Sequence, residues 1–511
     1  MDDLTTQTTD IVEIVKGIEQ STYDVETESR LARVGLKDGQ DIASILEQYA
    51  WLYNLETVKA AENAYRTESD PAEKERLRRV YYYVLNGFIE RQTAALDDRL
   101  TTYEMEATVE VDGETIPYHN VRAVAAQEPE YDRRDRLRDA SLRVVEHTNP
   151  DRLELLRTRL DVLSTEFGYY DYTAYNSDSK RVDYSLLRAN LEDFLVRTES
   201  VYLDHMGRWV ERATGRKLGQ IGSNHFVFMS RMPQYDEYFS KDRLLDVYDR
   251  TLRGLGIDIS TQTNIHLDIE DRPKKNPRAV CYPSRPPSEV HLIIKPIGGL
   301  DDYSAFFHEA GHAQHYGNTD PSLPYLDRAI GTSYALTEIY SFLLQFLTVN
   351  PAWLTDMFEM PQAVAEEVVY YIKLTELFML RRYVSKLQYE LRFFEEPLNN
   401  ERNQELYAGQ LEAGTRFVYQ PQGYLYDMDA GYYTADYLRA WITEAMLRHH
   451  LESTYGERWF NAPEAGKLLR DLWATGEQKE NEDVATMLGY SPFDTSYLAA
   501  QYTSLRSPSE R

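Results

Sequence analysis

Cysteine is almost missing from this chain of 511 residues, in which Cys281 is the only one. A single thiol excludes internal disulfides and is typical of a reducing compartment. The chain also lacks a run of 18 uncharged apolar residues, because Glu338 interrupts the nearest candidate, residues 334–349. The segment Met1-Asp2-Asp3-Leu4 has no basic region and no apolar core, so no secretory signal is visible. We therefore expect a cytoplasmic protein with no membrane partner.

Positive charge is scarce as well. The sequence has 56 Lys and Arg against 84 Asp and Glu, which gives a formal net charge of -28, and only 14 of the 56 are Lys. This balance argues against a nucleic-acid partner, which needs a basic footprint, and against an anionic membrane surface. An acidic, Lys-poor surface is typical of a salt-rich cytoplasm but can equally follow from genome composition. Activity that grows with molar KCl would support the first interpretation.

The spacing of apolar residues predicts a mainly α-helical protein. At 511 residues and 42% hydrophobic content the chain can bury a large core and hold two or three lobes. Apolar positions recur every three to four residues in five N-terminal stretches and again over most of 301–473; the five are 41–54, 57–66, 71–97, 131–167 and 184–214. Residues 104–118 alternate around Asp112-Gly113, which predicts a β-hairpin. Strand-like pieces in 264–296 predict a small sheet beside the helix that follows.

That following helix, expected over 303–316, carries the motif His308-Glu309-Ala310-Gly311-His312. Residues four apart on a helix return to nearly the same face, so both imidazoles can reach one Zn²⁺ at about 2 Å. The Glu between them points beside the metal, where it can take a proton from the attacking water. Phe306 and Phe307 make one side of the helix apolar, and buried His and Glu side chains need partners such as a metal. The five residues therefore predict two metal ligands and a general base.

A catalytic zinc needs a third protein ligand. The class with a third His six residues after the second one is excluded, because Asn318 occupies that position. The alternative is a Glu from a later helix, and the apolar stretch 332–349 contains one acid, Glu338. An unpaired carboxylate there is costly unless a metal lies near. A solvated edge or a pair with Arg328 is the competing explanation. Ser341, nearly one turn on, can orient the carboxylate.

His315 shares a helical face with His308 and His312, but seven residues along a helix is roughly 10 Å, too far from His308 for both to bind one ion. We expect it to support the ligands or to face the substrate, with a purely structural role almost as plausible.

These residues resemble the thimet oligopeptidase/oligopeptidase F family of zinc peptidases (family M3), which is related to angiotensin-converting enzyme. The family pattern H-E-x-G-H-x-x-H matches residues 308–315, and a ligand Glu in E-x-P-S follows about twenty-five residues later, where this chain has Glu338-Ile339-Tyr340-Ser341. Residues 281–285 and 289–299 resemble the strand and glycine stretch before the zinc helix. Asp429-Ala430-Gly431-Tyr432-Tyr433 resembles the D-A-x-Y-Y segment, and 472–493 the closing segment. The likeness covers about 260–500.

The resemblance implies a helical protein of two lobes around a deep cleft that admits short peptides. It also implies that the first Tyr of the pair, Tyr432, hydrogen-bonds the oxyanion, since a phenol donates without adding a fixed charge. The chain departs from the pattern at two places. No His occurs in 419–427, where Gln422, Tyr424 or Tyr426 must serve instead, and the family's further Tyr is replaced by Ala435, which leaves Tyr433 or Tyr437 for that position.

The glycine stretch allows a further hypothesis. If the strand expected at 289–296 has a free edge toward the cleft, a peptide can pair with it as an added strand. Gly298 and Gly299 would then let the substrate backbone approach. An ordinary turn explains the same two glycines equally well.

We therefore predict a mainly α-helical, two-lobed zinc metallopeptidase with a deep cleft, a small β-sheet beside the zinc helix and one Zn²⁺ per chain. Residues 1–205 would form an N-terminal helical lobe and 206–511 the catalytic lobe, with the lobes interleaved. His308, His312 and Glu338 would bind zinc, Glu309 would be the base, and Tyr432, ahead of Tyr433 and Tyr437, would donate to the oxyanion.

Two alternatives remain. A zinc carboxypeptidase or dipeptidase would use the same centre with an arginine clamp, for which Arg381, Arg382 and Arg416 are candidates, although surface ion pairing is their default role. A catalytically silent peptide-binding protein of the same fold is the other. The sequence leaves the oligomeric state open.

Overall fold

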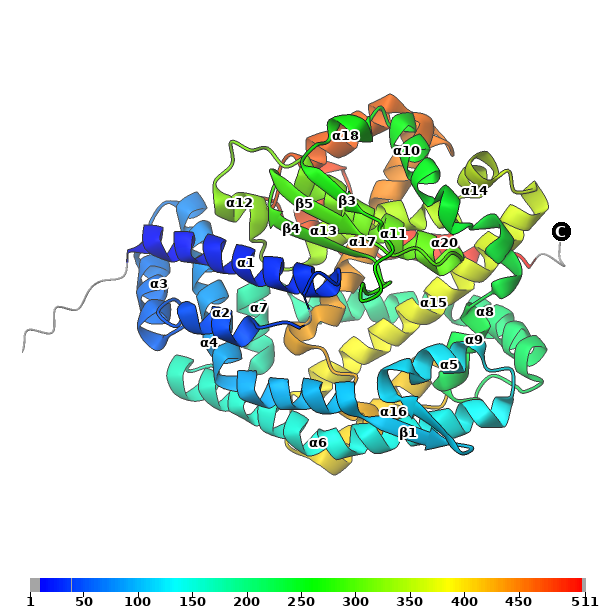
Figure 1. Ribbon diagram of the computed structural model, residues 1–511, viewed down its shortest axis with the longest axis horizontal. Coiled ribbons are helices and arrows are strands. Elements are labelled where there is room, and N and C mark those ends of the chain that lie inside the picture. The colour runs from blue at the N-terminus through cyan, green and yellow to red at the C-terminus, as the bar shows by residue number, and fades with distance from the viewer. Residues whose placement is uncertain (1–9, 38, 508–511) are drawn as a thin grey trace, which may run out of the picture.

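The computed structural model describes residues 10–37 and 39–507, and this part of the chain is mainly α-helical with two small sheets, as the sequence predicts (Figure 1). Residues 1–4, on which the expectation of no leader depends, lie outside it. Among the helices that are described, none has the length and apolar content that crossing a membrane requires.

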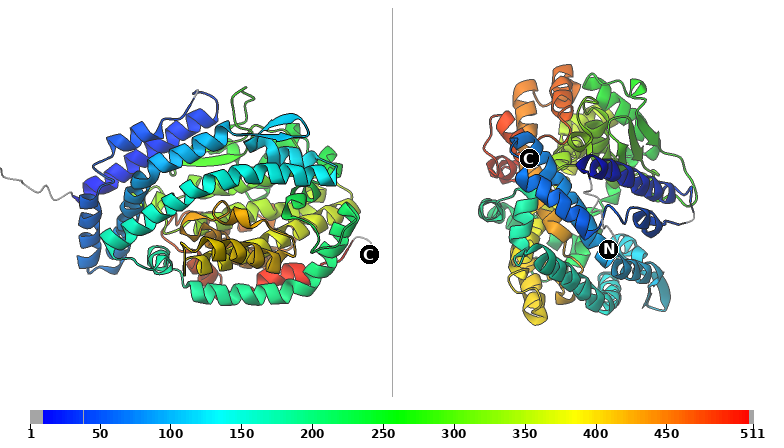
Figure 2. Two further views of the ribbon diagram at one scale, coloured as in Figure 1. Left: turned by 90° about the horizontal axis from the view of Figure 1, so that it is seen from below. Right: turned by 90° about the vertical axis from the view of Figure 1, so that its left-hand side faces the viewer.

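Helices form most of the N-terminal 214 residues. In order, the helices and strands of this part are α1 (Ile11–Arg33), α2 (Ile42–Gln48), α3 (Leu55–Thr67), α4 (Pro71–Glu106), β1 (Thr108–Val111), β2 (Glu114–Pro117), α5 (Val121–Gln127), α6 (Tyr131–Phe167), α7 (Tyr172–Lys180) and α8 (Tyr184–Thr214). The bounds of α6 and α8 are those predicted. Both helices end at a glycine in the left-handed region, Gly168 and Gly215, which is a common way for a helix to stop. Helices α4 and α6 lie side by side (Figures 1 and 2).

Three predictions in this region need correction. The helix predicted over 71–97 is α4, which continues to Glu106. The hairpin is shorter than 104–118, because residues 104–106 are the last turn of α4. Its turn is the predicted Asp112-Gly113, and the positive φ of both residues (54° and 82°) is what a tight hairpin turn requires. Helix α2 ends at Gln48, well before the predicted residue 54.

The predicted boundary between residues 205 and 206 falls inside α8, a continuous helix of 31 residues, so it matches no break in secondary structure. One hydrophobic cluster contains residues from Ile14 to Tyr502 and thus includes side chains from both predicted segments. A second, smaller cluster underlies the hairpin and contains Val109, Val111 and Leu137. The division into lobes stays a prediction.

The middle of the chain holds a three-stranded sheet against a helix. Its elements are α9 (Phe226–Ser230), α10 (Leu244–Gly254), β3 (Ile265–Asp268), β4 (Val280–Arg285), β5 (Glu289–Ile293), α11 (Leu300–Gly317), α12 (Tyr325–Ala329) and α13 (Ala335–Gln345). Strand β5 lies between β3, which is parallel to it, and β4, which is antiparallel. The sheet contacts α11 through β4 and β5 (Figure 1), which confirms the predicted small sheet beside this helix.

The idea that a peptide pairs with the strand at 289–296 is wrong. That strand is β5, which is central, and its backbone groups already bond to neighbours on both sides. The edge strand next to α11 is β4.

The C-terminal part is again helical. It contains α14 (Pro351–Phe358), α15 (Gln362–Phe393), α16 (Asn400–Thr415), α17 (Tyr433–Tyr455), α18 (Pro463–Trp473), α19 (Asn481–Met487) and α20 (Ser496–Thr503). The apolar stretch predicted as one helix over 332–349 is divided between α13 and a short 3₁₀ helix, Phe346–Val349. Helix α13 lies between α11 and α17, and these three helices carry the candidate site.

Candidate metal centre

The site depends on an unusually close approach of α11 and α13. Gly311 of α11 faces the backbone of Tyr340 and Ser341 on α13, and a Cβ at Gly311 would lie 2.6 Å from the carbonyl carbon of Tyr340 and closer still to its oxygen. Real Cβ atoms do not come that near to backbone, so only glycine permits this contact. The small residue thus lets the two helices bring their polar side chains together.

His308, His312 and Glu338 meet where the helices cross. Their ligand atoms all lie within 4.8 Å of one another, and in the described part of the chain this is the one group of three or more His, Cys, Asp or Glu side chains with that spacing. The Oε2 atom of Glu338 is 3.3 Å from His308 Nε2 and 3.7 Å from His312 Nε2. Two ligands bound tetrahedrally at about 2 Å from zinc are about 3.3 Å apart. The observed separations fit that requirement.

Each imidazole is oriented through its other nitrogen. His308 Nδ1 lies 2.8 Å from Gln345 Oε1, which can only accept, so Nδ1 carries the proton and Nε2 has a free lone pair. His312 Nδ1 lies 2.7 Å from Thr337 Oγ1. Burial lowers the pKa of both imidazoles and so favours the neutral form that a metal requires. Contacts of this kind to the non-ligating nitrogen are typical of metal-binding histidines.

The Glu338 carboxylate is buried and hydrogen-bonded from two sides. Ser341 Oγ donates to Oε2 over 2.8 Å, and the Tyr433 hydroxyl donates to Oε1 over 3.3 Å. Burial raises the pKa of Glu338 to about 7. Arg328, the alternative partner, instead donates to the carbonyl of Pro286 over 2.7 Å. The carboxylate is therefore neither solvated nor neutralised by an arginine, and a divalent cation would favour its ionised form.

Glu309 lies beside this group, held by the sheet. Its Oε2 accepts the backbone N–H of Cys281 on β4 over 2.8 Å, so one oxygen is fixed by the edge strand. Burial raises the pKa of Glu309, although His308 opposes the shift. A carboxylate with a raised pKa is suited to accept a proton near neutral pH.

His315 lies among aromatic rings and not against the ligands. Its side chain is fully buried, with ring centroids 4.9 Å from Tyr316 and 4.8 Å from Tyr340. Its Nε2 is 3.4 Å from the carbonyl of Gly476, and burial lowers its pKa to about 4. These contacts favour the structural alternative over the ligand-supporting or substrate-facing role.

Tyr432, the leading candidate for the oxyanion donor, is placed elsewhere. It is completely buried, and its hydroxyl lies 2.7 Å from Thr173 Oγ1 on α7. Its ring contacts Tyr172 and Tyr184 at centroid distances of 5.6 and 5.0 Å. The preceding backbone explains the displacement, because Gly431 and Tyr432 both have positive φ (64° and 53°) and α17 begins only at Tyr433. This placement argues against Tyr432 as the oxyanion donor, and the identity of the donor stays a prediction.

Tyr433 and Tyr437, one turn apart on α17, are the phenols that the structure brings to the site. Tyr433 donates to Glu338, and Tyr437 packs against it with ring centroids 4.7 Å apart. Burial, followed by the nearby Glu338 charge, raises the pKa of both hydroxyls, so each remains a donor at neutral pH. Tyr334 contacts the other side of the Tyr433 ring at 5.3 Å.

The glycine stretch before α11 forms an ordinary turn. Gly298 and Gly299 have φ of 96° and 94°, which other residues rarely adopt. The N–H of Gly298 donates to Asp302 Oδ2 over 2.6 Å, and that of Gly299 donates to the carbonyl of Phe239 over 2.9 Å. Both donors are used within the protein, which supports the turn interpretation and not a contact with substrate.

Other candidate residues have partners away from the metal group. The arginines proposed for a clamp are bonded internally: Arg381 donates to the carbonyl of Gly414, Arg382 pairs with Asp427, and Arg416 pairs with Glu199.

The residues expected to replace the family's His before the Tyr pair also have partners away from the metal group. The carbonyls of Gln422 and Tyr424 accept from Asn149 and Tyr389, the Tyr426 ring contacts Arg152, and Ala435 is buried on α17.

Sequence reasoning missed Gln345, Thr337 and the Cys281 N–H. Gln345 could have been found, since 338, 341 and 345 recur at helical spacing and so share one face of α13. Thr337 and Cys281 carry no such signal, because their roles depend on how α13 and β4 pack against α11.

Two hollows border the site. One, of about 350 Å³, reaches from Tyr433 and Tyr334 to Tyr83, Tyr175 and Arg159 of the N-terminal helices. The other, of about 230 Å³, contains Gln345, Trp441 and Met379. Each includes a residue that contacts a candidate ligand, Tyr433 in the first and Gln345 in the second.

Comparison of the chain with protein-family models finds no matching model, and comparison with curated proteins finds no match either.

Proposed function

We propose that this chain is a zinc-dependent peptidase that hydrolyses peptide bonds in short peptides, and that it is a member of the M3-like family its motifs resemble. The observation that carries the proposal is the convergence of His308, His312 and Glu338 at a spacing that suits tetrahedral zinc, with Glu309 near enough to interact electrostatically with His308 and Glu338. Zinc bound there would act as a Lewis acid on the peptide carbonyl and on water.

The chain's own residues have separate roles in this proposal. Glu309, fixed by the Cys281 N–H, takes the proton of the attacking water and passes it to the leaving amine. Gln345 and Thr337 keep the Nε2 atoms of the two imidazoles directed at the cation. Tyr433, with Tyr437 packed against it, is the donor nearest to the candidate ligands; its single O–H donates to Glu338, and turned away from that carboxylate it would donate to the developing oxyanion.

The preference for short peptides rests on the family resemblance, which implies two lobes around a deep cleft. The hollows of about 350 and 230 Å³ include Tyr433 and Gln345, which contact candidate ligands, but neither is lined by the ligands themselves. The charge balance of -28 and the single cysteine support a cytoplasmic protein with neither nucleic-acid nor membrane partners.

The test is cleavage of short peptides, with free and with blocked ends, by the purified chain. We expect about one zinc per chain, loss of cleavage after chelation and its return with Zn²⁺. Cleavage of end-blocked peptides identifies an endopeptidase, whereas a strict need for a free carboxylate identifies a carboxypeptidase. Peptide binding without any cleavage by the zinc-loaded chain would establish the silent alternative.

The assignment of the oxyanion donor to Tyr433 has its own prediction. Removing the hydroxyl in Tyr433→Phe is expected to lower kcat by roughly 10²-fold, the typical loss for one oxyanion donor. Tyr432→Phe removes only the contact with Thr173 and is expected to leave kcat within about twofold while costing about 1 kcal/mol of unfolding free energy. Steady-state kinetics and thermal unfolding of the two variants test this, and the opposite order of kcat values would restore Tyr432 to the site.

A further inference from the structure

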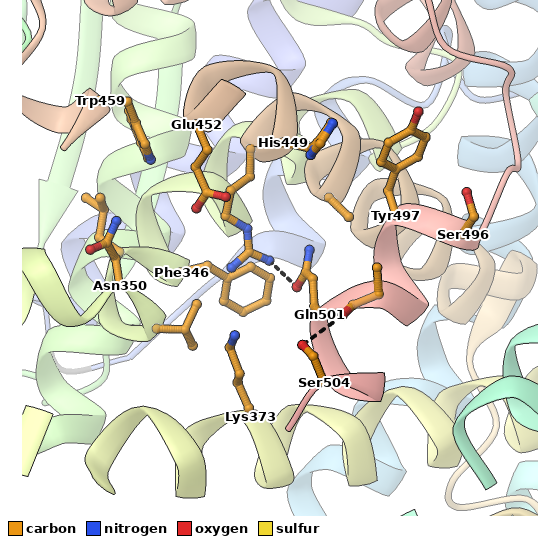
Figure 3. Close-up of a pocket in the computed structure, with 15 residues that line it drawn as sticks. Phe346, Asn350, Lys373, His449, Glu452, Trp459, Ser496, Tyr497, Gln501 and Ser504 are labelled. Carbon is orange, nitrogen blue, oxygen red and sulfur yellow. Dashed lines mark hydrogen bonds between the residues drawn. The ribbon is translucent and has the colours of Figure 1, made fainter. Parts of the chain in front are cut away.

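A cavity of about 560 Å³ lies away from the candidate metal centre, between the 3₁₀ helix Phe346–Val349, α15, α17 and α20 (Figure 3). Phe346 lines it and stacks on Phe342 with ring centroids 5.5 Å apart, and Phe342 contacts the edge of His308 at 5.4 Å. Two aromatic rings thus lie between this cavity and the metal ligand, so it is a separate site.

A lysine points into this cavity without a partner. Lys373 rises from α15 with its ammonium directed toward the Phe346 ring (Figure 3), and the described residues offer it no hydrogen bond and no ion pair. Glu376 and Glu452 lie near enough for their charges to favour the ammonium, but among the described residues neither forms an ion pair with it. A half-buried ammonium without a direct hydrogen bond or ion pair loses hydration that these more distant charges replace only in part.

A second cation increases that cost. Arg448 of α17 also lines the cavity, where its Nε lies 3.0 Å from Glu444 Oε1 and its Nη2 donates to Gln501 Oε1 over 2.6 Å. Burial, and after it the charge of Arg448, lowers the pKa of Lys373. An anion placed beside Lys373 would relieve this repulsion and restore the lost hydrogen bonds.

The cavity wall is mixed, with Asn350, Glu452 and Gln501 among its polar members and one apolar part that suits an apolar group. Leu347, Val349 and Ala500 line it together with the rings of Phe346 and Trp459. Ligand sites commonly combine such walls with one or two charged groups that fix the orientation of the ligand.

We propose that this cavity binds a small carboxylate with an apolar body, whose carboxylate pairs with Lys373 Nζ and whose body lies against Phe346 and Trp459.

The probe is N-acetyl-L-leucine, compared with its neutral isostere N-acetyl-L-leucinamide, and binding to the full zinc-loaded chain is measured by calorimetry. The acid is expected to bind and the amide to bind at least about tenfold more weakly, because it lacks the charge that pairs with the lysine. Since binding is measured and not turnover, the outcome does not depend on the proposed peptidase activity.

Substitution locates the site. Lys373→Met is expected to raise the Kd of the acid at least about tenfold, whereas Lys373→Arg keeps it within a few-fold. The control is Lys467→Met, which removes an exposed lysine paired with Asp471 and should not change Kd.

If the acid binds to zinc instead of the cavity, its Kd would be the same in all three variants. Three results would each overturn the proposal. They are an acid affinity that is the same in the unsubstituted chain and in Lys373→Met, an affinity that is the same for acid and amide, and no binding of the acid. If Lys373→Met does not fold, the acid–amide comparison is repeated on the chelated, zinc-free chain, where a retained preference for the acid supports the cavity and its loss overturns the proposal.

Discussion

Glu309→Gln is expected to leave zinc bound and to lower kcat by roughly 10²–10⁴-fold, the usual contribution of a general base. The amide is nearly isosteric with the carboxylate, and its oxygen can still accept the Cys281 N–H that fixes Glu309. Glu309 is not one of the three clustered ligands, so the metal affinity should change little. The lost function is proton acceptance, because a glutamine amide has no lone pair of comparable basicity.

The measurement is metal content together with steady-state kinetics on a short peptide. A fall in kcat with zinc retained locates the defect in the chemical step. Loss of zinc would mean that Glu309 supports the ligand set instead. Unchanged turnover in a zinc-loaded variant would rule out the proposed mechanism.

Gly311→Ala is expected to destabilise the protein by about 1–3 kcal/mol, a typical cost of overpacking, and to weaken zinc binding. The added methyl group would lie 2.6 Å from the Tyr340 carbonyl carbon, so α11 and α13 must separate. Glu338 is on α13 and both histidines are on α11, so the same separation pulls the ligand set apart. Stability and metal affinity should therefore fall together.

Gly207→Ala is the matched control. Gly207 lies inside α8, and a Cβ there meets nothing within 4 Å, so alanine should be neutral or stabilise the helix by up to about 1 kcal/mol. Chemical unfolding and zinc titration of both variants provide the comparison. If Gly311→Ala is as stable as Gly207→Ala and holds zinc equally well, the close helix approach is not what assembles the site.

Much of the local structure follows from the sequence. Helices α6 and α8 have the predicted bounds because a regular apolar spacing continues up to a glycine that stops each helix. The position of His308, Glu309 and His312 on one helix is likewise local, since a four-residue spacing fixes their relation on any α-helix. Glu338 stood out as the single acid in an apolar helix, and the structure places it beside both histidines.

The structure differs from the predictions where a side chain's role depends on a distant element. Tyr432 and Tyr433 are adjacent in an unbroken sequence motif, but the left-handed backbone at Gly431 and Tyr432 turns the first ring toward α7 and the second toward Glu338. The strand at 289–293 looked like an available edge, yet β3 pairs with it from residues 265–268 and leaves β4 as the edge strand.

The sequence by itself indicated the helical class and the pair of imidazoles with the carboxylate between them, because both depend on spacing within a helix. It indicated Glu338 as the candidate third ligand because that residue is the one acid in an apolar stretch. Only the tertiary structure decided which tyrosine reaches the ligands, which strand holds Glu309, and that Lys373 faces a cavity without a partner. The apolar pattern of a helix repeats every three to four residues, so it can be recognised from the local sequence alone. The face that a helix turns toward its neighbours depends instead on contacts between residues far apart in the chain, such as Gly311 with Tyr340 or Tyr432 with Thr173.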